Sequence, residues 1–213
     1  MKITWLNDDS GMTGLRAEPG EYDASPPVDS LLFDYAPQSI NPERLAIAAY
    51  LAFGRWVSGD LQLPTKLGPA TAAAIERDLE HVHVRPGPIE YYPKPLEIGT
   101  RNVHLNLTEV GSTPFAEDTI SVLPSSRWNG GLRGLRSLMI SSNAFAIDSS
   151  GSAHRESVRA RLAVAVLFAG DLTADTLMVR VPTELAEFET ERLTELLLSV
   201  RLGIEFQYAH DLT

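Results

Sequence analysis

Cysteine is absent from this chain of 213 residues. Without thiols the protein has no disulfides, no thiolate nucleophile and no zinc or iron–sulfur centre with cysteine ligands. Chains of this kind are typical of intracellular proteins, so we expect a cytoplasmic location.

Basic residues are also scarce. The chain has 18 Lys and Arg against 28 Asp and Glu, which gives a net charge of −10. Proteins that bind nucleic acids neutralise phosphates with Lys and Arg, so we expect no direct nucleic-acid binding. The charge suits a soluble protein or one with a basic partner.

Long hydrophobic runs are missing as well. The longest, residues 45–53 and 162–169, are much shorter than the roughly 20 residues that a membrane-spanning helix needs. The first six residues are followed by Asp8 and Asp9 before an apolar signal core can form. We therefore expect no membrane span and no export signal.

Motifs that carry known chemistry are absent too. The sequence has no Gly-x-Ser-x-Gly elbow, no Walker loop and no His-Glu-x-x-His pair. His81 and His83 have the spacing of one strand face, and His104 on another predicted strand could supply a third metal ligand. No carboxylate accompanies them in a known metal pattern, and the exposed face of an antiparallel sheet explains all three equally well. Asp8 and Asp9 are typical of an acidic turn. We predict no metal and no cofactor.

What the sequence does contain is an ordinary globular composition, with 44% hydrophobic and 22% charged residues. Its length suits one substantial core, so we predict a single domain over residues 1–213. Residues 1–40 form an acidic, loop-rich N-terminal region, since residues 1–43 carry eight acids against two bases. No internal repeat is visible.

Three helices are predicted. The first starts at Pro42 behind a capping Asn41, and it is apolar nearly all round as far as residue 57. Such a helix lies in the core or is covered by a partner. The others span residues 70–80 and about 183–200. Glu189 interrupts the apolar stripe of the last helix, and its carboxylate either reaches water or is buried with a raised pKa.

Strands are predicted by alternating or short apolar runs. Prolines restrict residues 85–95 to an edge strand or a loop. Residues 170–175 are predicted to be a polar hairpin connection between two strands. The fold class is therefore α+β (mixed α/β), with one largely antiparallel or mixed sheet and about three packed helices. The predicted strands are residues 2–6, 31–35, 82–84, 89–92, 103–107, 120–123, 138–147, 162–168, 177–181 and 204–208.

One stretch stands out by its charge. No acid occurs between residues 119 and 147, whereas Arg127, Arg133 and Arg136 lie there with Trp128 and several glycines. Arginine beside an aromatic suits an anionic ligand or an acidic partner segment. These four residues are our candidate binding site. The alternative is that the arginines pair with the acidic N-terminal region of the same chain.

Two hypotheses follow for function. The first is a non-catalytic binding or accessory subunit of a cytoplasmic complex, with a protein partner or a second copy of the chain. The second is an enzyme acting on an anionic small molecule that bears phosphate or carboxylate. In that enzyme Arg127, Arg133 and Arg136 would hold the substrate, and His81, His83 or His104 would be base or metal ligand. The sequence does not decide between an enzyme and a non-catalytic protein.

Overall fold

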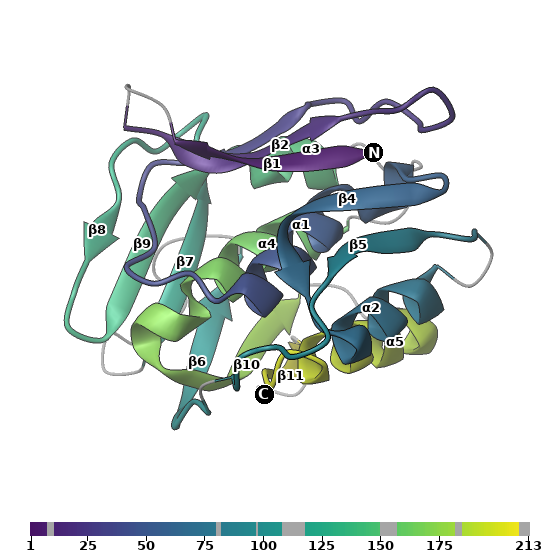
Figure 1. Cartoon of the computed structure of the whole chain (residues 1–213). Helices are drawn as coiled ribbons and strands as arrows, with labels where there is room; N and C mark the ends of the chain where they lie inside the picture. The colour runs from purple at the N-terminus through teal and green to yellow at the C-terminus, as the bar shows by residue number, and fades with distance from the viewer. Residues whose placement is uncertain are drawn as a thin grey trace.

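The computed structural model describes residues 1–7, 11–79, 82–96, 98–107, 118–149, 157–181 and 185–208. These residues form one mixed sheet of 11 strands together with five α-helices and two 3₁₀ helices (Figure 1). The predicted α+β class is confirmed. In this part of the chain no helix has the length and hydropathy required to cross a bilayer.

The elements fall into two halves. The first half contains β1 (Lys2–Asn7), β2 (Thr13–Glu18), β3 (Ser30–Phe33), α1 (Pro42–Phe53), a 3₁₀ helix (Gly54–Trp56), β4 (Asp60–Leu67), α2 (Pro69–Asp78) and β5 (Arg85–Ile89). The second half contains β6 (Arg101–Asn106), β7 (Thr119–Pro124), β8 (Leu132–Arg133), β9 (Ser137–Ser142), α3 (Ala144–Asp148), α4 (Arg159–Phe168), a 3₁₀ helix (Ala169–Leu172), β10 (Ala174–Val181), α5 (Glu187–Leu198) and β11 (Gly203–Tyr208).

Both halves have the same order of elements. Each contains three strands, a helix followed by a 3₁₀ turn, a strand, a second helix and a last strand, and the second half adds β8 and α3. Across the sheet the strand order is β3-β2-β1-β4-β5 in one half and β9-β7-β6-β10-β11 in the other. The halves also meet through equivalent elements, because β3 pairs with β9, α1 packs on α4 and α2 packs on α5. The fold therefore contains a duplicated order of elements that the sequence did not reveal as a repeat.

One strand breaks the correspondence. In the first half β2 is antiparallel to both β1 and β3, so hairpin connections suffice. In the second half β7 is parallel to both β6 and β9, so the chain must cross back from the carboxyl end of one strand to the amino end of the next. Residues 125–136 make this return between β7 and β9, and they carry β8. The long connection is a direct consequence of the direction of β7.

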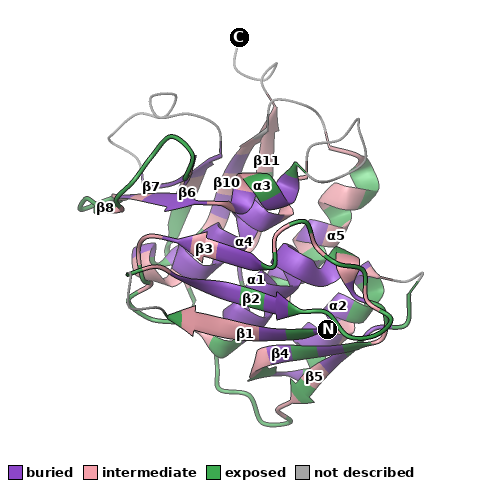
Figure 2. Cartoon of the chain, turned by 90° about the horizontal axis from the view of Figure 1, so that it is seen from above, coloured by how far each residue is buried: buried purple, intermediate pink, exposed green. Residues whose placement is uncertain are grey.

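The central pair of helices forms the core. The sheet curves round α1 and α4, which pack against each other (Figure 1). Every residue of α1 from Leu45 to Phe53 is buried, as is every residue of α4 from Ala160 to Phe168 (Figure 2). The prediction that the first helix is a core element is confirmed. Its apolar surface is covered by the chain itself.

The start of α1 agrees with the predicted capping. The side-chain oxygen of Asn41 accepts hydrogen bonds from the backbone N–H groups of Glu43 (2.9 Å) and Arg44 (3.3 Å), and Pro42 occupies the first helical position. Glu43 in turn accepts from the backbone of Gly68 (2.7 Å) and from the hydroxyl of Thr71 (2.6 Å). The carboxylate thereby joins the first turn of α1 to the first turn of α2.

The largest error of the sequence interpretation lies at residues 162–168, which form α4 and not a strand. A helix that is buried on all sides shows no periodicity, so it cannot be distinguished from a buried strand by its pattern. The hairpin predicted at residues 170–175 is therefore wrong as well. A 3₁₀ turn stands there instead and leads from α4 into β10, which is parallel to both of its neighbours.

Smaller differences concern strand ends. The predicted strand at 138–147 ends at Ser142, where α3 takes over, and β2 lies inside the predicted N-terminal loop. Residues 82–84 are not a strand. The proline-rich stretch does contain the edge strand β5, as expected for residues that cannot donate backbone hydrogen bonds.

Glu189 is partly buried, with 24% of its side chain exposed. It lies in the first turn of α5, and its carboxylate accepts two hydrogen bonds from Arg159, at 2.7 and 3.0 Å. The guanidinium of Arg159 also binds Asp78 through both terminal nitrogens. The charge that interrupts the apolar stripe therefore belongs to an ion-pair cluster between helices.

Candidate partner-binding surface

Residues 125–136, the β8 segment, contain all four residues of the predicted site. β3 pairs with β9 only at Ser142, which leaves most of that edge of β9 free, and β8 occupies it. The ladder places Leu132 opposite Met139 and Arg133 opposite Leu138. The segment is therefore held as a strip along β9, and it is exposed over most of its length (Figure 2).

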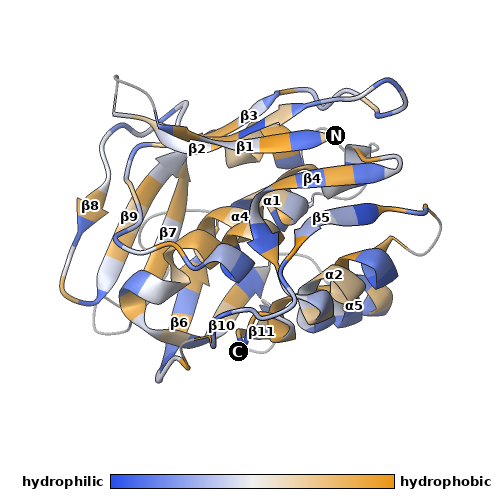
Figure 3. Cartoon of the chain, in the orientation of Figure 1, coloured by the Kyte–Doolittle hydropathy of each residue, from blue (hydrophilic) through white to orange (hydrophobic). Residues whose placement is uncertain are grey.

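Three large apolar side chains of this strip face solvent. Leu135 is 95% exposed, Leu132 63% and Trp128 41%. Figure 3 shows that β8 contains both a hydrophobic and a hydrophilic residue. Their backbone positions follow β9, because the Trp128 carbonyl accepts a hydrogen bond from the hydroxyl of Ser141 (2.7 Å), Leu132 pairs with Met139, and Leu135 lies in the turn before Ser137. From one end to the other the row extends roughly 14 Å.

Two glycines of the β8 segment are required by its own backbone conformation and packing. Gly130 has a φ of +91°, a conformation that other residues rarely adopt. A Cβ on Gly131 would lie 2.7 Å from Cβ of Tyr35, so only glycine allows the strip to lie against this residue after β3.

Arg133 is fixed by an aspartate from the second half. Its guanidinium donates to the carboxylate of Asp171 at 3.2 Å and to the backbone carbonyl of that residue at 3.3 Å. The same carboxylate accepts from the backbone N–H of Gln38 at 3.1 and 3.2 Å. Asp171 therefore ties the β8 segment to the chain between β3 and α1.

Arg136 belongs to a second cluster, at the amino ends of the parallel strands. Its guanidinium donates to both carboxylate oxygens of Asp118, at 3.0 and 3.3 Å, and Arg101 donates to one of them at 3.0 Å. Asp118 is buried, and the hydrogen bonds from Arg136, then those from Arg101, hold the pKa of its carboxyl below the usual value although burial acts in the opposite direction. Together with Leu135 these residues line an open hollow of about 440 Å³.

The four predicted residues thus lie on one segment, but they do not converge on a single site. Arg127 and Trp128 lie at the carboxyl end of β7, whereas Arg136 lies at the amino end of β9. Arg133 pairs with Asp171 and Arg136 pairs with Asp118, whereas the alternative had predicted pairs with acids of the N-terminal region. The side chain of Arg127 makes no hydrogen bond or ion pair with the described residues.

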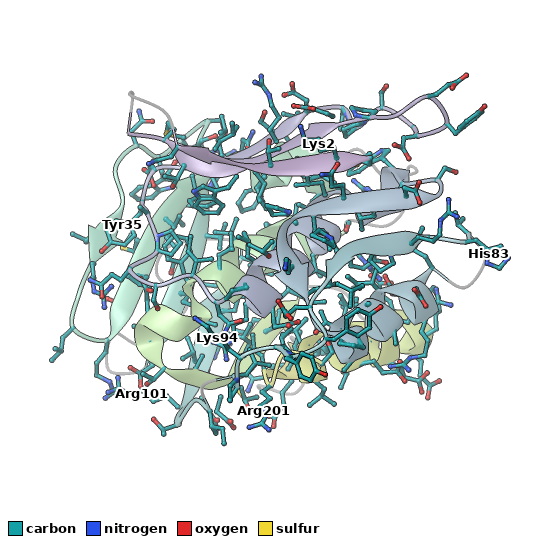
Figure 4. The ribbon with its side chains drawn as sticks, in the orientation of Figure 1. Lys2, Tyr35, His83, Lys94, Arg101 and Arg201 are labelled. Carbon is teal, nitrogen blue, oxygen red and sulfur yellow. The ribbon has the colours of Figure 1, made fainter. Side chains whose placement is uncertain are left out.

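Of the three candidate histidines, the structure describes His83 and His104. His83 lies at the opposite side of the molecule from Arg101 (Figure 4), while His104 is on β6. His81 lies outside the described residues, as do Asp8 and Asp9. Among the described residues no group of three or more His, Asp or Glu side chains could hold a metal ion.

Sequence reasoning missed four residues of this region. Leu132 and Leu135 look like core residues until the strand pairing shows that they face outward. Arg101 and Asp118 are far from the β8 segment in the chain, and only the parallel register of β6, β7 and β9 brings them to Arg136. No sequence signal identified these two.

Comparison with protein-family models, with curated proteins and with solved structures found no match to this chain. The function is therefore argued from the geometry of the surface alone.

Proposed function

We propose that the protein is a non-catalytic binding or accessory protein that docks another protein chain on the β8 segment. The exposure of Trp128, Leu132 and Leu135 within eight residues carries the proposal. Exposed apolar side chains that lie close together mark binding surfaces, whereas single ones need no explanation. Trp is moreover among the side chains that contribute most to protein interfaces.

The charges beside the strip indicate the chemistry of the partner. Arg101, Arg127, Arg133 and Arg136 lie in or next to it, and the stretch from residue 119 to 147 contains no acid. Asp118 pairs with Arg101 and Arg136, and Asp171 pairs with Arg133, so the four arginines outnumber the carboxylates that the described residues place against them. The surface suits a partner segment that presents acidic and apolar side chains.

The first helix does not support a partner-binding role. Its apolar surface suggested a missing partner, but α4 and the sheet cover it within the chain. The proposal therefore rests on the β8 segment. The enzyme hypothesis required arginines and histidines around one pocket, and the hollow at Arg136 has no histidine among its lining residues.

The test compares three forms of the protein in affinity purification from the native host, with mass spectrometry. The first is the wild type and the second carries Trp128→Ala and Leu132→Ser. The control carries Tyr22→Ser and Leu198→Ser, which remove side chains 80% and 58% exposed in two separate parts of the chain outside the β8 segment. We expect the same protein partner with wild type and control, and its loss with the double β8 variant.

Equal recovery by all three forms would contradict the proposal. Size-exclusion chromatography with light scattering separates a further outcome. If the wild type elutes as a dimer and the double β8 variant as a monomer, the surface is an interface between copies of this chain and no other protein is its partner.

A further inference from the structure

The hollow at the amino ends of β6, β7 and β9 has a rigid frame. Arg101 opens β6, while Asp118 and Arg136 immediately precede β7 and β9. Backbone hydrogen bonds join these strand ends, from His104 N–H to the Asp118 carbonyl (2.8 Å) and from Thr119 N–H to the Arg136 carbonyl (2.9 Å). The two arginines are therefore positioned by a sheet and not by a loose loop.

Asp118 orients both guanidinium groups. Its buried carboxylate accepts a single hydrogen bond from Arg101, through Nη1, and a guanidinium has five N–H donors, so Arg101 can donate to a further acceptor. The side chains of Arg101 and Arg136 remain 46% and 52% exposed, and both line the hollow.

We infer that this hollow is an oxyanion site, which binds a carboxylate or phosphate group between Arg101 and Arg136 with an apolar substituent against Leu135. The planar, forked guanidinium matches the paired oxygens of such groups. Leu135 is 95% exposed and forms the apolar wall of the hollow. The inference goes beyond the proposed function, because an anion free in solution and an acidic side chain of a docked partner share this chemistry.

Two probes distinguish these sources: inorganic phosphate, and a capped Leu-Glu-Leu peptide. Each is titrated into the isotope-labelled full chain, with sodium chloride at equal ionic strength as the blank, and backbone amide shifts are followed by NMR. We expect saturable shifts at Arg101, Thr119, Leu135 and Ser137. Tighter binding of phosphate identifies a free anion as the ligand, and tighter binding of the peptide identifies an acidic side chain.

Arg101→Gln should weaken binding about tenfold, the effect of losing a hydrogen bond from a charged donor. Arg85→Gln removes an arginine of β5 that is 77% exposed and lies outside the β8 segment, and it should leave the affinity unchanged. The NMR spectrum of Arg101→Gln shows whether this variant folds. If it does not, Arg101→Lys replaces it in the test. Lysine keeps the positive charge but lacks the forked guanidinium, so this variant should also bind more weakly than the wild type. Absence of saturable shifts with both probes, or equal affinity of wild type and the Arg101 variant, would overturn the inference. Trp128 and Leu132 are untouched, so this result is independent of the partner-binding test.

Discussion

The hydroxyl of Tyr50 on α1 donates a hydrogen bond to the carboxylate of Asp78 on α2, and both side chains are buried. Arg159 at the start of α4 binds the same carboxylate at 2.6 and 3.0 Å and continues to Glu189 on α5. The cluster thus joins the two long helices of each half. It is one of several polar contacts between the halves, beside the hydrogen bond from Arg192 to the Asp78 carbonyl (3.1 Å) and the ion pair of Arg77 with Glu195 (3.4 Å).

Removing the charge of Asp78 should cost more stability than any surface change. Asp78→Asn leaves the mostly buried guanidinium of Arg159 with one carboxylate in place of two, and breaking a buried ion pair costs about 3–5 kcal/mol. Urea unfolding measures the loss. As control, Arg85→Gln breaks the pair of Arg85 with Asp60, in which both side chains are 77% exposed, and should change the free energy of unfolding by less than about 1 kcal/mol. Equal effects of the two variants would contradict the assigned role.

Tyr50 should make the protein sensitive to alkali. Burial and the neighbouring carboxylate of Asp78 raise the pKa of its phenol well above the ordinary value. The folded state then retains a proton that the unfolded state releases near pH 10, so this contribution to stability is full below about pH 10 and is lost as the pH rises further. Tyr50→Phe should show a smaller decrease in stability above pH 10. In addition, the tyrosinate absorbance of the folded wild type and of the variant should coincide near pH 11, since Tyr50 is not yet ionised.

Asp118 should make the stability of the protein depend on pH in the acid range, in the opposite direction to Tyr50. The hydrogen bonds from Arg136 and Arg101 lower the pKa of its carboxyl. Its contribution is therefore present above the unfolded pKa of about 3.9 and is lost as the pH falls through the lower folded value. Between about pH 5 and pH 2 the wild type should lose more stability than Asp118→Asn. Parallel curves of unfolding free energy against pH for the two proteins would show that the pairing contributes nothing.

Gly131→Ala should displace the β8 segment. The added Cβ would lie 2.7 Å from Cβ of Tyr35 and 3.1 Å from its ring, so the strip or the tyrosine must move, at a cost of about 1–3 kcal/mol. The matched control is Gly170→Ala, whose Cβ would be 3.5 Å from its nearest neighbour, an ordinary contact. Trp128 fluorescence and urea unfolding should both change with the first variant alone. If Gly131→Ala has the fluorescence spectrum of the wild type, the β8 segment does not pack against Tyr35 as described.

Local signals predicted those parts of the fold that depend on neighbouring residues. The cap at Asn41 and the proline after it determine the start of α1, and alternation identified most of the strands. The helix at residues 159–168 was missed because complete burial removes the periodicity by which helices are recognised. Likewise, the duplication lies in the strand order, and no similarity of residues between the halves records it.

The candidate surface was predicted in part, for the same reason. A run without acids indicated Arg127, Arg133 and Arg136, since net charge is visible in sequence. The aspartates that bind two of them are contributed by other elements, Asp118 from before β7 and Asp171 from the turn after α4. Only the three-dimensional structure brings these groups together.

The packing of α1 on α4 has a consequence for how the molecule comes apart. Each helix is apolar on nearly every side, and each covers the other. Separating the halves would expose the apolar surfaces of both helices at once, so neither half could keep a hydrophobic core of its own. The chain should melt in one cooperative transition, and a protease cut in the connection between β5 and β6 should leave two fragments that stay associated until denatured.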